Sequence, residues 1–152
     1  MTDPYQEVAV VLPYSDGKIL LQLRDFNPSI AFPGHWGYFG GSIGTNEKPI
    51  EAAFREIIEE LCYTPIELYF LEKNLLPEHN NLISYLYCFK LDAPIEALIQ
   101  TEGLDLKLAS HEEVLTKNVY SNKLNKSFPI IHHPYFLDMF QQCLTFMAGN
   151  SH

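Results

Sequence analysis

Glu56, Glu59 and Glu60 have the spacing that points most directly to chemistry. An α-helix turns by about 100° per residue, so side chains at positions i, i+3 and i+4 lie on one side of it. Carboxylates held that close repel one another, by about 4 kcal/mol for a pair near the surface. A hard cation such as Mg²⁺ would turn this repulsion into ligation, because it takes oxygen ligands and leaves positions for water and substrate phosphates. The spacing therefore predicts a magnesium site for phosphate chemistry.

The simplest alternative is an acidic helix face that is only solvated, which is the usual fate of such a pattern. Apolar residues on the opposite side of the helix argue for a site. These residues recur at helical spacing, so the helix is expected to pack against the protein and to hold its carboxylates in place. They are Ile50, Phe54, Ile57, Ile58 and Leu61.

The three glutamates also end a longer pattern of fixed spacing. Five residues separate Gly41 from Glu47, seven separate Glu47 from Arg55, and the glutamates follow at once. This pattern, over residues 41–63, resembles the signature of the Nudix hydrolases. In that signature a glycine is followed by a glutamate, an arginine–glutamate pair and two further adjacent glutamates.

Two stretches of the signature differ from the family pattern. Cys62 stands where the family has its last glycine, and Tyr63 stands at the last apolar position. Residues 44–47 read Gly-Thr-Asn-Glu, where many members read Glu-x-Gly-Glu. A glycine at the helix end usually caps the helix, so its replacement bears on local geometry but removes no charged group. Within residues 45–46, Thr45 or Asn46 is the expected cap at the start of the helix.

The resemblance implies a set of metal ligands. The carboxylates of Glu56, Glu59 and Glu60 would bind the metal, together with the backbone carbonyl of Gly40. In several Nudix proteins a further glutamate reaches the metal from outside the signature. Glu102, which precedes a glycine, is the candidate here, and an exposed loop acid is the equal alternative.

The resemblance also implies a catalytic group of Glu47, Arg55, Glu56 and Glu59. In the family pattern, Arg55 pairs with Glu47 and holds the preceding loop against the helix. A solvated cation is the alternative for this arginine. Either Glu59 or Glu102 would orient or deprotonate the attacking water, and the sequence leaves both open.

Arg24 and Gly41 are the expected substrate contacts. Arg24 ends a predicted strand, where many Nudix proteins have a phosphate-binding arginine, and its guanidinium suits bidentate phosphate contact. A surface ion pair with the adjacent Asp25 is equally open. Residues 26–36 contain two prolines and a glycine, so they form either a packed connector or a loop over the substrate base.

Length and composition favour one folded domain over residues 1–152, with 47% hydrophobic residues. The net charge of −9 argues against a nucleic-acid polymer or a membrane surface as partner, since both bind basic patches, but it allows a small nucleotide.

The cysteines show no ligand-like spacing, which indicates free thiols in a reducing compartment. The polar N-terminal segment is unlike a signal peptide, and no apolar run is long enough to span a membrane, so a cytoplasmic protein is expected.

Strand and helix patterns surround the signature. Residues 7–14 and 18–24 predict a hairpin, and residues 133–146 predict a docked terminal helix. Further strands are predicted at residues 66–73, 82–91 and 104–109. The pattern alone indicates a mixture of α and β structure. The resemblance implies an α/β/α sandwich with a central mixed β-sheet.

The function implied by the resemblance is a Mg²⁺-dependent hydrolase, with Mn²⁺ as a substitute. It would cleave the phosphoanhydride of a nucleoside diphosphate linked to another moiety, as in a nucleoside triphosphate, ADP-ribose or a sugar nucleotide. One alternative is a catalytically weak Nudix-like domain that senses a nucleotide without cleaving it, and another is a metal-free structural protein. Dimers are common among relatives, and the sequence leaves the choice between a monomer and a homodimer open.

Overall fold

A mixed β-sheet forms the centre of the molecule, which a computed structural model describes over residues 5–77, 81–131 and 133–150. A parallel pair, β1 (Gln6–Ser15) and β6 (Leu82–Lys90), lies in the middle of the sheet. The other strands join by antiparallel pairing, and they are β2 (Lys18–Leu23), β3 (Trp36–Gly37), β4 (Phe39–Ser42), β5 (Tyr69–Leu76) and β7 (Asp105–Ala109). The order is β3-β2-β1-β6-β5, with β4 paired to β1 and β7 paired to β2.

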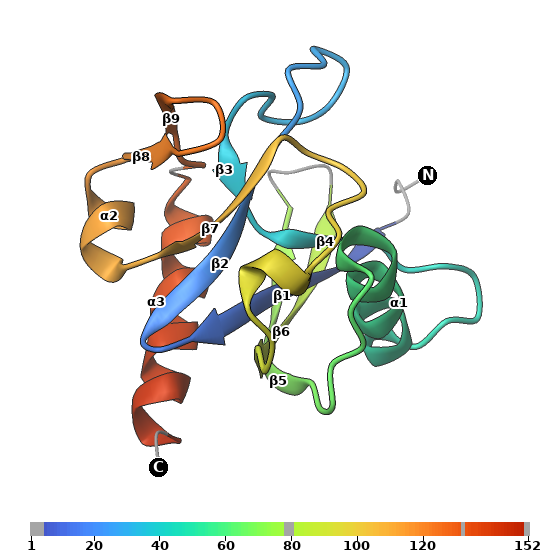
Figure 1. Ribbon diagram of the computed structural model, residues 1–152. Coiled ribbons are helices and arrows are strands. Elements are labelled where there is room, and N and C mark those ends of the chain that lie inside the picture. The colour runs from blue at the N-terminus through green and yellow to red at the C-terminus, as the bar shows by residue number, and fades with distance from the viewer. Residues whose placement is uncertain (1–4, 78–80, 132, 151–152) are drawn as a thin grey trace.

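Helices cover both faces of this sheet (Figure 1). One hydrophobic cluster lies between the sheet and α1 (Pro49–Leu61), beside the short 3₁₀ helix η1 (Ile95–Ala97). The second cluster lies on the other face, under α3 (Pro134–Gly149), α2 (His111–Leu115) and the hairpin of β8 (Asn118–Ser121) and β9 (Lys126–Pro129). The predicted α/β/α sandwich is confirmed.

The valine-rich run in β1 follows from its central place. Ala9 and Val11 pack into the cluster under α1, and Val10 and Leu12 pack into the cluster under α3. A strand that is covered on both faces has no solvent side, so it reads as a continuous apolar run instead of alternating. β1 can therefore hold residues of both helical layers in fixed positions.

The predicted N-terminal hairpin is also confirmed. Ser15 pairs with Lys18 across a two-residue turn, in which Asp16 and Gly17 both have positive φ, of 50° and 75°. That geometry matches a type I′ turn, whose twist suits a tight hairpin. The strand predicted at residues 66–73 begins later, at Tyr69, and the terminal helix runs on to Gly149. The connection after β5 falls partly on residues 78–80, outside the described residues.

The hairpin of β8 and β9 has no counterpart among the predicted elements. It packs over the edge of the sheet, where the buried Trp36 donates its indole Nε1–H to the Val119 carbonyl at 2.9 Å. The Lys117 carbonyl accepts from the Ile130 N–H at 3.1 Å. The antiparallel pairing of β8 with β9 defines the hairpin, but such short strands of mixed polarity give little periodic signal in the sequence.

At the start of α1 the capping residue differs from the prediction. At the end of α1 the backbone conformation explains how Cys62 can stand in place of the family's glycine. The N-cap is Lys48, followed by Pro49, so the prediction of Thr45 or Asn46 as the cap is wrong. Cys62 takes the left-handed conformation, with φ 52° and ψ 39°, and its N–H donates to the Ile58 carbonyl at 3.0 Å. The cysteine therefore keeps the backbone path that a C-capping glycine would follow.

Replacing Cys62 with glycine is expected to stabilise the protein by about 0.5–1 kcal/mol, because glycine adopts the left-handed conformation without a Cβ clash. The melting temperature should rise by roughly 1–4 °C. Differential scanning calorimetry would measure this rise. Cys62→Ala is the matched control, since it removes the thiol but keeps the Cβ and should give no gain. A lower melting temperature for the glycine variant would contradict the strain argument.

Candidate active site

Arg55 organises a cluster of charges at the junction of β4 and α1. Its Nε and Nη2 donate to the two carboxylate oxygens of Glu47 at 2.8 and 3.0 Å, and Nη2 also donates to the Ser42 carbonyl at 2.9 Å. Its Nη1 donates to Glu56 Oε1 at 2.9 Å and to Glu59 Oε2 at 3.4 Å. The pair with Glu47 is therefore present and bidentate, and it ties the loop before α1 to the helix.

Glu47 is held firmly as an anion. Its hydrogen bonds with the Arg55 guanidinium, and a further one from the Gly44 N–H at 2.8 Å, lower the pKa of Glu47 from 4.5 to about 2. Hydrogen bonds to the charged form of a carboxyl group always act in this direction. The fold therefore favours ionised Glu47 over the protonated form.

Changing Glu47 to glutamine should lower the melting temperature at pH 7 and leave it nearly unchanged at pH 2. A carboxyl whose pKa falls from 4.5 to about 2 on folding stabilises the protein above pH 4.5. That contribution disappears as the pH falls through the folded-state pKa. Melting curves of both proteins from pH 2 to pH 7 would measure the gap, and a gap of equal size at every pH would contradict the assigned pKa.

Glu60 is a buried acid on the inner side of α1. The Gly40 N–H donates to its Oε2 at 3.1 Å. The pKa of Glu60 is raised to about 8, chiefly by burial and also by the negative charges of Glu56 and Glu102, while the Gly40 N–H and the Arg24 charge act in the opposite direction. Burial also raises the pKa of Glu56, against the lowering effect of Arg55. Strongly perturbed acids that gather in one cleft are a physical mark of a functional site.

Arg24 shares a cavity of about 160 Å³ with Glu60 and Glu102. Its Nε donates to the Ala31 carbonyl at 2.6 Å, whereas Asp25 Oδ2 accepts from the Gly103 N–H at 3.2 Å. The surface ion pair left open for Arg24 and Asp25 is thus absent from the described residues. The Arg24 guanidinium and three carboxylates, those of Asp25, Glu60 and Glu102, instead line the same space.

The loop that carries Glu102 is fastened to the end of α1. The Thr101 N–H donates to the Glu60 carbonyl at 3.1 Å, and its hydroxyl donates to the Glu59 carbonyl at 2.7 Å. Glu102 itself is exposed, yet it lines the cavity and acts electrostatically on both Glu56 and Glu60. Glu102 is therefore an exposed loop acid that also faces the cavity, and its role as a metal ligand stays a prediction.

Gly40 and Gly41 permit the close approach of strand and helix. A Cβ on Gly41 would lie 2.4 Å from Glu56 Oε1, far inside contact distance. Gly40 has φ of 133°, and a Cβ there would lie 2.0 Å from the Ala9 carbonyl oxygen. Only glycine allows this backbone conformation together with this approach. The two glycines consequently set how near the backbone comes to Glu56 and Glu60.

The NUDIX domain family matches residues 4–127 of the chain, which include the whole acidic cluster. The chain belongs to the Nudix family. By family, this Nudix protein is a pyrophosphohydrolase that acts on acid anhydrides in phosphorus-containing compounds. Among curated proteins, no sequence matches it.

Solved structures of other Nudix proteins share its fold. A MutT protein from Methanosarcina mazei Go1 is 20% identical over 100% of this chain and 99% of its own, with a TM-score of 0.70. A MutT NUDIX hydrolase from Burkholderia pseudomallei is 17% identical over 92% of this chain and 98% of its own, with a TM-score of 0.67. The E. coli dihydroneopterin triphosphate pyrophosphohydrolase is 15% identical over 95% of this chain and 99% of its own, with a TM-score of 0.66.

No helix in the described part of this chain has the length and apolar character of a membrane span.

The donor set of the Nudix site suits a divalent hard cation. Its candidate ligands are all oxygen atoms, which Mg²⁺ and Mn²⁺ prefer. The raised pKa of Glu56 and Glu60 marks a negative, partly desolvated environment that a cation would offset. Across residues 5–77, 81–131 and 133–150, no three His, Cys, Asp or Glu side chains form a ligating group. Glu59 is the least constrained acid, with its side chain 58% exposed. The site therefore matches a hard divalent cation in its type of donor atom and in its negative charge.

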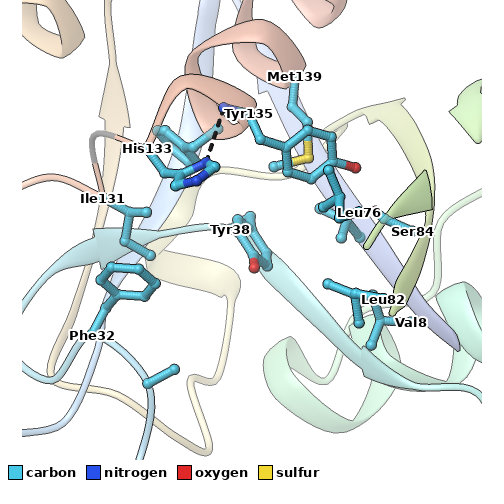
Figure 2. A pocket seen from close by; sticks show the side chains of 13 residues that line it. Val8, Phe32, Tyr38, Leu76, Leu82, Ser84, Ile131, His133, Tyr135 and Met139 are labelled. Atoms are coloured by element: carbon cyan, nitrogen blue, oxygen red, sulfur yellow. Dashed lines mark hydrogen bonds between the residues drawn. The ribbon is translucent and has the colours of Figure 1, made fainter. Parts of the chain in front are cut away.

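A second, apolar cavity of about 230 Å³ opens on the face of the sheet under α3 (Figure 2). Tyr38, between β3 and β4, faces Tyr135 and His133 from the start of α3 across it, and Phe32 lies at one side. The predictions named none of these side chains individually, although Phe32 lies in residues 26–36, which were left open as a loop over the substrate base. Aromatic and apolar side chains in strands and helices usually form the core, so no sequence pattern separates a cavity wall from a packed interior.

The two cavities are neighbours. Gln22 lines the polar cavity and donates from its Nε2 to the carbonyl of Tyr38, which lines the apolar one, at 3.1 Å. Arg24 lowers the pKa of Tyr38 against the larger raising effect of burial, so its charge also reaches that ring. Residues 30–32 separate the cavities, because Ile30 lines the polar cavity and Ala31 the apolar one. The two cavities therefore lie on either side of residues 30–31.

Proposed function

We propose that this Nudix protein is a Mg²⁺-dependent hydrolase, also served by Mn²⁺, that cleaves a phosphoanhydride in a nucleoside diphosphate linked to another group. The observation that carries the proposal is the single cavity shared by Arg24, Glu60 and Glu102, with Glu56 coupled electrostatically to both acids. A site for diphosphate hydrolysis needs a cation to bind phosphate and carboxylates to bind metal and water. This cavity provides both kinds of group.

The protein's own residues position the reacting groups. The Arg24 guanidinium binds phosphate oxygens, and the Arg55 guanidinium, itself held by Glu47, orients the Glu56 carboxylate. The carboxylates of Glu56, Glu59 and Glu60, with the Gly40 carbonyl, would hold the cation. When bound, the cation would offset charge that develops on the phosphoryl oxygens and lower the pKa of the attacking water.

The acid that takes the proton from the attacking water is proposed to be Glu59 or Glu102. Both are exposed, so water reaches them, whereas the Glu60 carboxylate is buried. A general base must come within hydrogen-bond distance of the proton it removes. Glu59 contacts Arg55 only at 3.4 Å and can move toward a bound substrate, and the Glu102 loop is already tied to the end of α1.

The neighbouring cavities suggest how a substrate is divided between them. Phosphates belong with Arg24 in the polar cavity, and the uncharged end of the substrate belongs in the apolar one, where none of the described lining residues is Asp, Glu, Lys or Arg. One structural neighbour acts on dihydroneopterin triphosphate. A nucleoside triphosphate, with a flat uncharged base and charged phosphates, suits this arrangement.

The test is a substrate panel of nucleoside triphosphates, ADP-ribose and sugar nucleotides, each with Mg²⁺, Mn²⁺ or EDTA. We expect metal-dependent release of a nucleoside monophosphate from at least one class, scored by kcat/KM. Binding of the same compounds without turnover would instead favour a Nudix-like sensor. Addition of either metal should also raise the melting temperature if the site binds it, whereas a metal-free structural protein would show no rise.

The remaining parts of the proposal concern partners and location. The net charge of −9 supports a small nucleotide over a nucleic-acid polymer as the substrate. We further propose a cytoplasmic homodimer, in line with the family resemblance. Sedimentation equilibrium would report the molar mass directly.

A further inference from the structure

We propose that the hydroxyl groups of Ser84 and Tyr135 determine which nucleobase the apolar cavity accepts, and that they accept amino- and oxo-substituted bases alike. This inference rests on the proposed function, because it takes the cavity to receive the uncharged end of a nucleotide. It assigns specificity to two residues outside the acidic signature.

The two hydroxyl groups are buried, and within the described residues neither has a partner at normal hydrogen-bond geometry. Ser84 in β6 is 0% exposed, and the hydroxyl oxygen of Tyr135 at the start of α3 is also buried. Neither oxygen makes a hydrogen bond with another group in the described part of the chain. Buried polar groups in native proteins are nearly always satisfied, and each exception requires an explanation. Both residues line the apolar cavity, so a polar ligand in that cavity would satisfy them.

The hydroxyls lie on the same side of the cavity. Figure 2 shows the Tyr135 hydroxyl directed toward the strand that carries Ser84. Burial raises the pKa of Tyr135, and weak hydrogen-bonding interactions with the side chains of Ser84 and Asn74, outside normal hydrogen-bond geometry, lower it in part. The Tyr135 N–H is fixed by donation to His133 Nδ1 at 3.1 Å. The two hydroxyls are therefore presented together by two rigid elements.

The rest of the cavity fits a flat, uncharged ring. Its volume of about 230 Å³ is smaller than the 300–1,000 Å³ of sites that enclose a whole drug-sized ligand, so it suits one ring system. Phe32 and Tyr38 supply aromatic surface at its side and floor. Aromatic rings stack favourably on flat heterocycles. A sugar, which has hydroxyls on every side, would leave most of its polar groups against apolar walls.

Hydroxyl chemistry gives the predicted selectivity. A serine or tyrosine hydroxyl can donate or accept, because its hydrogen rotates to suit the partner. The pair should therefore bind an exocyclic amino group or an exocyclic oxygen equally well. A base that has neither group would leave both hydroxyls unsatisfied and should bind about 10-fold more weakly.

Nucleosides test this without any hydrolysis, because they contain no phosphate. We would titrate the protein with adenosine, inosine and purine riboside, and follow binding by NMR. Adenosine, with its amino group, and inosine, with its oxo group, should agree within about 3-fold, and purine riboside, which has neither group, should bind about 10-fold more weakly. Equal binding of all three members would overturn the inference.

Ser84→Ala and Tyr135→Phe should each reduce this selectivity, and the double variant should abolish it. Tyr85→Phe is the matched control, since Tyr85 follows Ser84 in β6 but packs with the cluster on the other face of the sheet. Selectivity that persists in the double variant would contradict the proposal.

The melting temperature separates a specificity role from a structural one. Removing an unpartnered buried hydroxyl should leave it unchanged or raise it, whereas a structural hydroxyl would lower it on removal. Failure of the proposed function has a different signature, since hydrolysis would then be absent while nucleoside selectivity is retained.

Discussion

Glu59→Gln is expected to lower kcat by about 100-fold or more, the scale of losing a general base or a charged ligand. Glutamine keeps the shape of the side chain but can neither take a proton nor supply a full negative charge. The side chain is 58% exposed and contacts Arg55 only at 3.4 Å, so the fold hardly depends on it. The melting temperature should therefore change by no more than about 2 °C, as for an ordinary surface substitution. Steady-state kinetics and thermal melting, each with Mg²⁺, would measure the two quantities.

Glu51→Gln is the matched control for that variant. Glu51 lies on the same helix, and its carboxylate only accepts the Lys48 N–H at 2.8 Å, a contact that glutamine can also make. The Glu51→Gln variant removes the same charge from α1. It should leave kcat within about 2-fold of the wild-type value, because Glu51 lies outside the site. If Glu59→Gln turned over like the wild type, Glu59 would have no catalytic role and Glu102 would be the remaining candidate.

Gly41→Ala is expected to reduce kcat/KM by about 100-fold through displacement of one carboxylate. The added Cβ would lie 2.4 Å from Glu56 Oε1 and 2.7 Å from Glu56 Cδ, so the carboxylate must move. The clash is with the flexible end of a side chain, so the chain should still fold. A shift of about 1 Å in a catalytic group is enough to cost about 100-fold in rate.

Circular dichroism and kinetics would together measure the effect of Gly41→Ala. Gly149→Ala is the control, since a Cβ there meets nothing within 4 Å. The alanine variant at position 41 should retain its secondary structure and lose activity. Wild-type activity in Gly41→Ala would show that catalysis does not depend on the position of Glu56. Unfolding of the variant would show that Gly41 is needed for the fold instead.

The cluster around Arg55 was predictable because helix geometry is local. Once residues 50–61 were read as a helix, the positions of Arg55, Glu56 and Glu59 relative to one another followed from its pitch. The contact with Glu47 depends only on a short loop before the same helix. The sandwich could likewise be inferred, because the apolar runs of β1 and β6 and the amphipathic terminal helix fixed which elements pack.

Contacts between segments that lie far apart in the chain could not be predicted from the sequence. The place of Glu102 depends on Thr101 binding the end of α1, more than 40 residues away, and only its resemblance to outlying Nudix glutamates suggested it. The pairing of Ser84 and Tyr135 in one cavity depends on how α3 docks on β6. A serine in a strand and a tyrosine in a helix have no spacing rule that links them, so only the three-dimensional structure shows that their hydroxyls lie together.

The central claim is that the acids of α1 bind a divalent cation beside a phosphate-binding arginine. A crystal soaked in Mn²⁺, with diffraction data collected at the manganese absorption edge, tests it most directly. We predict an anomalous peak within ligand distance of the carboxylates of Glu56, Glu59 or Glu60 and of the Gly40 carbonyl, near Arg24. Carboxylates that point into bulk solvent, with no anomalous peak between them, would contradict the account.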